Sequence, residues 1–118
     1  MPLQWDSIVI DCTDPLLVAS SWSEALGLEL HGPNDDHDLW LEPGGGCPDI
    51  RFGQVPEVKS LKDRIHLDLR PGDQAAEVER LIALGGRRID IGQGDVTWVV
   101  LADPEANEFC VLRSRSSD

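Results

Sequence analysis

Basic residues are scarce in this chain. Of its 118 residues, 10 are Lys or Arg and 22 are Asp or Glu, so the formal net charge is −12. This surplus of negative charge repels both a nucleic-acid backbone and an anionic membrane surface. We therefore expect neither nucleic acid nor a membrane as a partner.

Long apolar runs are also missing. The N-terminal stretch MPLQWDSIVID lacks the basic start and the continuous apolar run of a signal peptide. No segment reaches the roughly 18 apolar residues that a membrane span needs. We expect a cytoplasmic protein, and its length suits one domain with one core.

Paired cysteines are absent as well. Cys12, Cys47 and Cys110 are odd in number and far apart, and no C-x-x-C pair occurs. This usage is typical of reduced thiols rather than of a disulfide framework, and it gives no support to a structural zinc knuckle.

Two segments with alternating polarity predict half-buried strands. They are SIVIDC at 7–12 and IHLDLR at 65–70. In each, every second residue is apolar or small, so the remaining side chains share the opposite face. That polar face carries Ser7, Asp11, His66, Asp68 and Arg70.

A helix is predicted after each of these strands. Asp14 and Pro15 supply an N-cap and an N1 proline, and apolar residues at helical spacing continue to Gly27, which predicts a helix over 15–26. Asp73 caps a second helix that stops at the glycine pair 85–86.

Short extended segments follow each helix and are separated by turn residues. The strand candidates are DLWLE at 38–42 and DIRFGQV at 49–55 in the first half, with RRIDI at 87–91, VTWVVLA at 96–102 and EFCVLR at 108–113 in the second. Each half is therefore interpreted as β-α-β-β-β.

The two halves resemble each other residue by residue. The aligned pairs are Ser7 with His66, Trp40 with Trp98, and Phe52 with Cys110. We interpret them as two copies of one module within a single domain: module one at 1–54, a linker at 55–63 and module two at 64–118.

Two β-α-β-β-β modules in this length resemble the vicinal-oxygen-chelate superfamily of glyoxalases, extradiol dioxygenases and antibiotic-binding resistance proteins. More narrowly, VPEVKSLKDRIHLDLRP at 55–71, the helix ending in ALGG and DPEANEFCVLR at 103–113 resemble the actinobacterial type of glyoxalase-like domain. The resemblance implies an α+β fold whose curled mixed sheets enclose a shared cavity. It implies that the residues at the corners of this site, where relatives hold their metal, are Ser7, Phe52, His66 and Cys110.

The same resemblance implies a divalent metal at these corners in the relatives that use one. Such relatives usually carry His, Gln or Glu at the position of Ser7, His at that of His66 and Glu at that of Cys110. Only His66 matches, and one His with one Cys falls short of the three protein ligands of a catalytic zinc or iron site. We therefore expect no tightly held metal cofactor, and His66 and Cys110 are the candidate ligands if a divalent ion does bind.

The polar face around His66 is the best candidate for a binding site. Such a face must meet either bulk water or a polar pocket, and the resemblance favours the pocket. His66 is the catalytic candidate, as a general base, although it could equally form a hydrogen bond across the sheet. Asp68, about 6.6 Å along the strand, would act on it through charge alone, and Arg70 could hold an anionic group.

Trp40 and Trp98 have two possible roles. If their rings turn inward, they are flat walls for an aromatic or hydrophobic ligand. If they turn outward, they pack against a helix or a second subunit.

These patterns leave three hypotheses about function. The leading one is a glyoxalase-like domain, either a homodimer or an intimate two-module monomer, that binds a small organic molecule without a tightly held catalytic metal. Its ligand-binding set around His66 is Ser7, Asp11, Trp40, Phe52, Asp68, Arg70, Trp98 and Cys110. The second is an enzyme: a lyase, isomerase or epimerase that uses His66 as base, or a dioxygenase-type enzyme with a degenerate metal site. The third is a dimerising module with a vestigial cavity.

Overall fold

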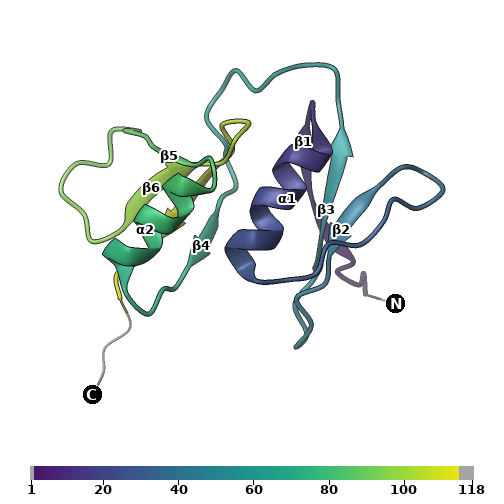
Figure 1. Cartoon of the computed structure of the whole chain (residues 1–118), viewed down its shortest axis with the longest axis horizontal. Coiled ribbons are helices and arrows are strands. Elements are labelled where there is room, and N and C mark those ends of the chain that lie inside the picture. The colour runs from purple at the N-terminus through teal and green to yellow at the C-terminus, as the bar shows by residue number, and fades with distance from the viewer. Residues whose placement is uncertain (1, 115–118) are drawn as a thin grey trace. The chain divides into compact units, whose positions relative to one another are not determined.

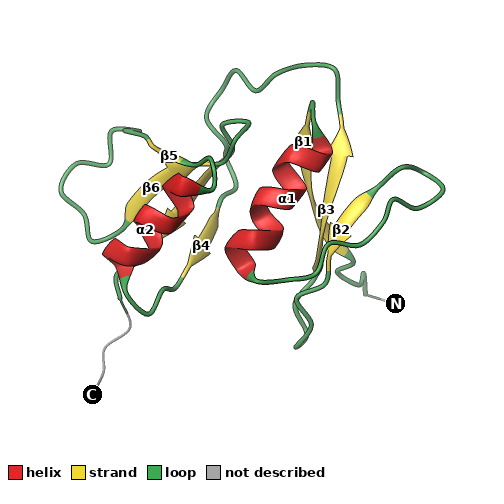
Figure 2. Ribbon diagram, viewed as in Figure 1, coloured by secondary structure: helices red, strands yellow, loops and turns green. Residues whose placement is uncertain are grey.

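The computed structural model describes residues 2–114 of the chain. The chain divides into two compact units, Met1–Val58 and Lys59–Asp118, and the boundary falls within the segment predicted as a linker. We keep the names module one and module two for these units. Each unit contains one helix and one sheet (Figure 2).

Module one contains a three-stranded mixed sheet. Its elements are β1 (Ser7–Cys12), α1 (Pro15–Leu26), β2 (Leu39–Leu41) and β3 (Asp49–Gln54). The strand order is β1-β3-β2, with β1 parallel to β3 and β2 antiparallel to it (Figure 1). An isolated bridge between His31 and Trp40 stands where a fourth strand would run, so among the described residues this module has one strand fewer than predicted.

Helix α1 has the limits that its capping residues predict. The Asp14 carboxylate accepts the backbone N–H of Leu17 at 3.2 Å, and Gly27 ends the helix in the left-handed conformation with φ 66°. A residue with a Cβ adopts that conformation at a cost, which glycine avoids. The buried side of the helix carries Val18, Ala19 and Trp22.

Module two contains a four-stranded mixed sheet. Its elements are β4 (Leu67–Leu69), α2 (Gln74–Ala83), β5 (Arg87–Arg88), β6 (Val99–Ala102) and β7 (Glu108–Val111). The strand order is β4-β7-β6-β5, with β4 parallel to β7 and the other pairs antiparallel. The order of one helix and four strands is the one predicted for each half.

Helix α2 is fixed at both ends. Asp73 caps it by accepting the N–H of Ala76 at 3.1 Å, and the Gln74 amide donates to two carbonyls of the sheet region, those of Thr97 and Val111. At the other end, a Cβ at Gly86 would lie 2.9 Å from the Leu81 carbonyl oxygen, so this close turn requires glycine.

Each sheet buries one face against its helix, which we call the helix face. In module one it carries Leu39, Leu41, Ile50 and Phe52, all buried. In module two it carries Leu101, Phe109 and Val111, also buried. The predicted α+β class is therefore confirmed, with two open mixed sheets.

None of the helices in residues 2–114 combines the length and the apolar character that crossing a membrane requires.

Candidate functional site

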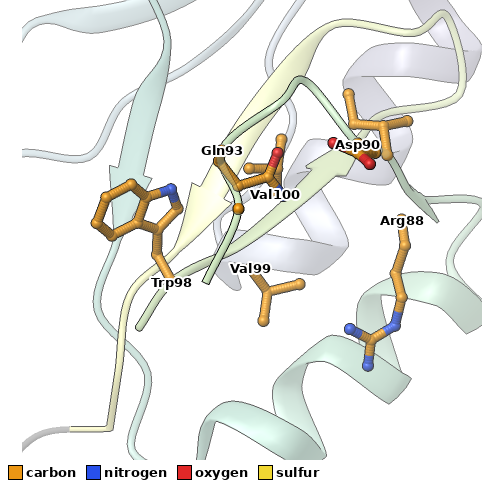
Figure 3. Close-up of a pocket in the computed structure, with 8 residues that line it drawn as sticks. Arg88, Asp90, Gln93, Trp98, Val99 and Val100 are labelled. Atoms are coloured by element: carbon orange, nitrogen blue, oxygen red, sulfur yellow. The ribbon is translucent and has the colours of Figure 1, made fainter. Parts of the chain in front are cut away.

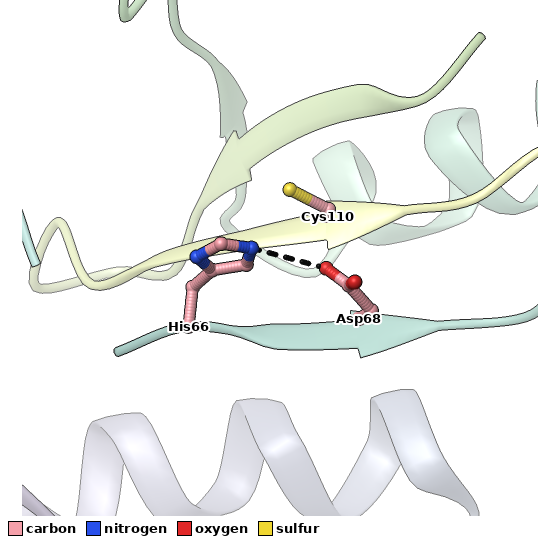
Figure 4. A group of neighbouring side chains, drawn as sticks. All are labelled: His66, Asp68 and Cys110. Carbon is pink, nitrogen blue, oxygen red and sulfur yellow. Dashed lines mark ion pairs between the residues drawn. The ribbon is translucent and has the colours of Figure 1, made fainter. Parts of the chain in front are cut away.

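Three side chains with metal-binding or acid–base chemistry meet on the edge of the module-two sheet. Asp68 on β4 is the direct neighbour of Cys110 on β7, and His66 lies just before β4 (Figure 4). The ligand atoms of the three residues all lie within 4.8 Å of one another. They share the face opposite the helix face, which we call the Cys110 face.

Strand alternation places these residues together. Leu67 and Leu69 point to the helix face, so Asp68 between them points to the Cys110 face. The parallel register then brings Cys110 beside Asp68, because paired residues on neighbouring strands project to the same side.

The His66 and Asp68 side chains approach each other more closely than the strand spacing indicates. His66 Nε2 lies 3.2 Å from Asp68 Oδ1, although an extended chain separates alternate residues by about 6.6 Å. The two side chains lean together, so the separation expected from the strand spacing is corrected, and Asp68 acts on His66 as an ion pair at contact distance. Both are about half exposed, so the pair adds little to stability even when the imidazole is protonated.

Cys110 is a buried thiol with a raised pKa. Burial is the main cause, and the Asp68 carboxylate adds to it through its charge and through a hydrogen bond with the thiol. The thiol therefore stays protonated and acts as a donor to Asp68, which does not suit a nucleophilic cysteine.

The donor set of this cluster fits a divalent metal such as zinc. An imidazole, a carboxylate and a thiolate are three accepted zinc ligands and leave a fourth position open. Binding would require loss of the Cys110 proton. The sequence analysis gave only His66 and Cys110 as candidate metal ligands, and Asp68 is the third ligand that the structure adds to them.

The corresponding face of module one is built differently. With Ser7 equivalent to His66, Val9 is equivalent to Asp68, and the residue paired with Val9 is Arg51. Arg51, not Phe52, is therefore the structural counterpart of Cys110. Phe52 points to the helix face and is 1% exposed, so the alignment of Phe52 with Cys110 is corrected by one residue.

Arg51 lies against an aromatic stack. Its guanidinium carbon is 5.7 Å from the centre of the Trp40 ring, and the His31 ring also stacks on Trp40. Asp38 approaches Arg51 at 3.5 Å, and Trp40 donates its indole N–H to Glu42 at 2.8 Å. Trp40 is thus engaged by its own module.

The remaining predicted residues have separate positions. Ser7 is half-buried and Asp11 exposed on β1, with Asp11 next to Gly53. Arg70 is exposed and donates to the Arg113 carbonyl at 2.9 Å. Trp98 lies outside β6 and lines a hollow of about 470 Å³ beside the loop that carries Asp90 and Gln93 (Figure 3).

Arg51 was not among the site residues predicted from the sequence. The signal was present in DIRFGQV, where Ile50 and Phe52 form the apolar face and Arg51 therefore points the other way. The alignment of tryptophans placed Trp40 with Trp98, whereas the strand pairing makes Val100, the neighbour of Cys110, the counterpart of Trp40.

A network in the predicted linker was also missed. Glu108 at the start of β7 accepts from the Lys59 ammonium at 3.0 Å and from the Asp63 backbone N–H at 3.1 Å. The Glu108 N–H donates in turn to the Asp63 carboxylate at 3.0 Å. We call these three residues the Glu108 network. It ties the segment before β4 to β7, two residues from Cys110.

Comparison with known proteins identifies the fold family. A family profile described as a glyoxalase-like domain matches residues 7–112, nearly the whole chain. No curated protein matches.

Several solved structures share the fold. A hypothetical protein, SA1046 from S. aureus, has a TM-score of 0.70 and 13% identity, over 96% of this chain and 94% of that chain. The fosfomycin resistance protein FosX from Listeria monocytogenes, solved with Mn(II) and a dihydroxypropylphosphonic acid, has the same TM-score and 13% identity, over 98% and 93%. A glyoxalase-related enzyme from Fulvimarina pelagi has a TM-score of 0.67 and 18% identity, over 92% and 86%. At these identities the likeness extends to the fold alone.

Proposed function

Because the chain belongs to the family of glyoxalase-like domains, we propose that it binds a small organic molecule on the Cys110 face of module two. The observation that carries the proposal is the cluster of His66, Asp68 and Cys110 on the side of the sheet that α2 leaves uncovered. A polar cluster of this kind beside apolar strand residues is typical of ligand sites. The fold accommodates such molecules, as the FosX complex with a phosphonic acid illustrates.

The residues of the cluster have distinct proposed roles. His66 is the polar anchor, and its imidazole can accept a proton from a ligand while Asp68 orients it. Cys110 supplies a neutral thiol that packs against the apolar part of the ligand. Arg70 and Trp98 flank this face as secondary contacts, whereas Phe52, in the core of module one, is left out of the proposal.

Thermal unfolding with a panel of aromatic and hydrophobic metabolites tests the proposal. We expect ligand-induced stabilisation that persists with chelator, about 2.7 kcal/mol at a ligand concentration 100 times the Kd. His66→Asn should remove it. His37→Asn is the matched control, because His37 is exposed in a loop with φ 64°, a conformation that asparagine tolerates. No stabilisation by any compound would contradict the proposal.

A second candidate function is a metal-assisted lyase, isomerase or dioxygenase. The specific observation in its favour is the convergence of three ligand atoms of different chemical types within 4.8 Å. His66, Asp68 and Cys110 would hold the ion, which would supply Lewis-acid polarisation of a bound oxygen.

Metal analysis distinguishes the two functions. Untagged protein purified under reducing conditions should contain one equivalent of metal if the second function holds, and Cys110→Ser and His66→Asn should both lose it. Metal below a tenth of an equivalent, roughly, even after incubation with zinc, would exclude this function.

We also propose that the protein is a homodimer. Large apolar side chains of module one lie at the surface: Leu3 is 99% exposed, Trp5 74% and Leu16 60%. A second copy of the chain would cover such residues. Sedimentation equilibrium should give twice the mass of one chain, and a single-chain mass at all concentrations would refute the dimer.

A further inference from the structure

Arg51 is a cation on the sheet face of module one that lies opposite its helix. We call this face, which carries Val9, Trp40 and Arg51, the Arg51 face. Arg51 occupies the position in module one that Cys110 occupies in module two, so the two modules carry side chains of different charge and polarity there. A thiol stands in one copy and a guanidinium in the other.

The guanidinium is oriented but only partly satisfied. Trp40 contacts it at 5.7 Å, and Asp38 is its only polar partner in residues 2–114, at 3.5 Å and through one nitrogen. A guanidinium has five N–H donors, so most of them stay available. The side chain is 34% exposed, which leaves room for a ligand to reach it.

We infer that Arg51 binds the carboxylate group of a small organic monoanion. Arginine matches such groups with two parallel N–H donors. Val9, paired with Arg51 and 55% exposed, offers apolar surface for the body of the same ligand. This anion site of module one goes beyond the binding proposed on the Cys110 face of module two and does not depend on it.

The neighbouring carboxylates restrict the choice further. Asp49 and Asp11 lie on the same face. Asp49 is two residues before Arg51 on β3, and Asp11 is two residues after Val9 on β1, and each of these spacings is about 6.6 Å along the strand. They do not compete at contact distance, but they repel negative charge at longer range. A single anionic group with an apolar body therefore fits this face better than a polyanion.

NMR titration of the full chain with benzoate and with benzamide, its neutral counterpart, tests the inference. We expect benzoate to shift the backbone amides of β1 and β3 and to bind roughly tenfold more tightly than benzamide, as a charge-assisted hydrogen-bond pair predicts. Arg51→Gln should abolish that preference, and Arg51→Lys should keep only part of it.

Two further variants separate ligand recognition from a structural role. Arg87→Gln makes the same charge change at an exposed position of module two and should retain the benzoate preference. Asp38→Asn removes the competing carboxylate, so it should increase benzoate affinity, whereas loss of a merely structural ion pair would not.

The outcomes distinguish this inference from the proposed function. Equal binding of both probes, or shifts confined to β4 and β7, would overturn the role of Arg51 and leave small-molecule binding in place. Failure of both probes to shift any amide, together with the failure of the metabolite panel, would overturn both.

Discussion

At the scale of single residues, the chemistry of module two depends on Asp68, which interacts with both His66 and Cys110. Its carboxylate contacts the His66 imidazole on one side and the Cys110 thiol on the other. Burial is the main cause of the raised Cys110 pKa, and the Asp68 carboxylate adds to it, since a nearby negative charge disfavours a thiolate.

We predict that Asp68→Asn makes Cys110 more reactive. Loss of the charge removes one of the causes that raise the Cys110 pKa, so a larger fraction of thiolate forms at pH 8. Alkylation by iodoacetamide, followed by peptide mass spectrometry, should be several times faster at Cys110. Burial remains the larger cause, so the rate should stay below that of the exposed Cys47.

The control for this prediction is Asp95→Asn, an exposed carboxylate in the same module. It should leave the alkylation rate of Cys110 unchanged. Equal rates in Asp68→Asn and the unmodified chain would mean that burial alone sets the pKa.

Residue-scale prediction from the sequence succeeded where a local pattern was enough. Alternation placed His66 and Asp68 on one side of the segment around β4, and the structure brings these two side chains together. Alternation could not show that the His66 and Asp68 side chains lean to 3.2 Å, because side-chain rotamers depend on neighbours that the strand pattern does not reveal.

At the scale of elements, the Glu108 network holds the segment before β4 on the start of β7. The Glu108 side chain is 8% exposed, so its hydrogen bonds are sheltered from water. Burial by itself raises the pKa of Glu108, but hydrogen bonds from Lys59 and from the Asp63 backbone outweigh it, and the pKa is lowered. The pKa of Asp63 is raised, by burial and then by its contact with Glu108.

Because the two pKa shifts have opposite directions, two isosteric substitutions should differ in their cost to stability. Glu108→Gln should lower the free energy of unfolding by about 1–3 kcal/mol at pH 7, because it removes the acceptor of a charge-assisted bond. Asp63→Asn should cost less than about 0.5 kcal/mol, because the neutral amide still accepts the Glu108 N–H and no longer repels Glu108. Urea denaturation measures both.

The pH dependence provides a check with a definite sign. A carboxyl with a lowered pKa stabilises the fold above its unfolded value, here 4.5, and loses that contribution as the pH falls through the folded value. The difference between the unmodified chain and Glu108→Gln should therefore shrink below pH 4.5. A gap that widens in acid would contradict the assignment.

Helix capping gives a separate prediction for α2. Asp73→Ala removes the acceptor for the Ala76 N–H and should destabilise the protein by about 1 kcal/mol, whereas Asp73→Asn should cost only a few tenths. Urea midpoints of the two variants give the comparison. Equal losses would show that the carboxylate charge, rather than the cap hydrogen bond, is what matters.

At the scale of the whole molecule, the net charge of −12 makes the stability of the fold depend on salt. Like charges repel most in the compact state, and salt shortens their range from about 30 Å at 0.01 M to about 8 Å at 0.15 M. The folded state should therefore gain from added salt.

We predict that raising NaCl from about 10 to 150 mM increases the free energy of unfolding by roughly 1 kcal/mol, measured by urea denaturation. In a control variant, Asp35, Glu57 and Asp95 are each replaced by lysine. Each replacement adds +2 to the net charge, so the three together change it from −12 to −6. All three residues are exposed. Its response to salt should be about half or less, and an undiminished response would point to specific ion binding.

The sequence by itself determined the local structure: the limits of α1, the caps at Asp14 and Asp73, the alternation of the strands and the repeated module. These signals lie within a few residues of the features they specify. Only the tertiary structure decided the pairing register that puts Arg51 opposite Val9 and Phe52 in the core. It also decided the Glu108 network across 45 residues of sequence. Register and long-range contacts depend on which strands meet, and a one-residue change in that pairing reverses every side chain without altering the local pattern.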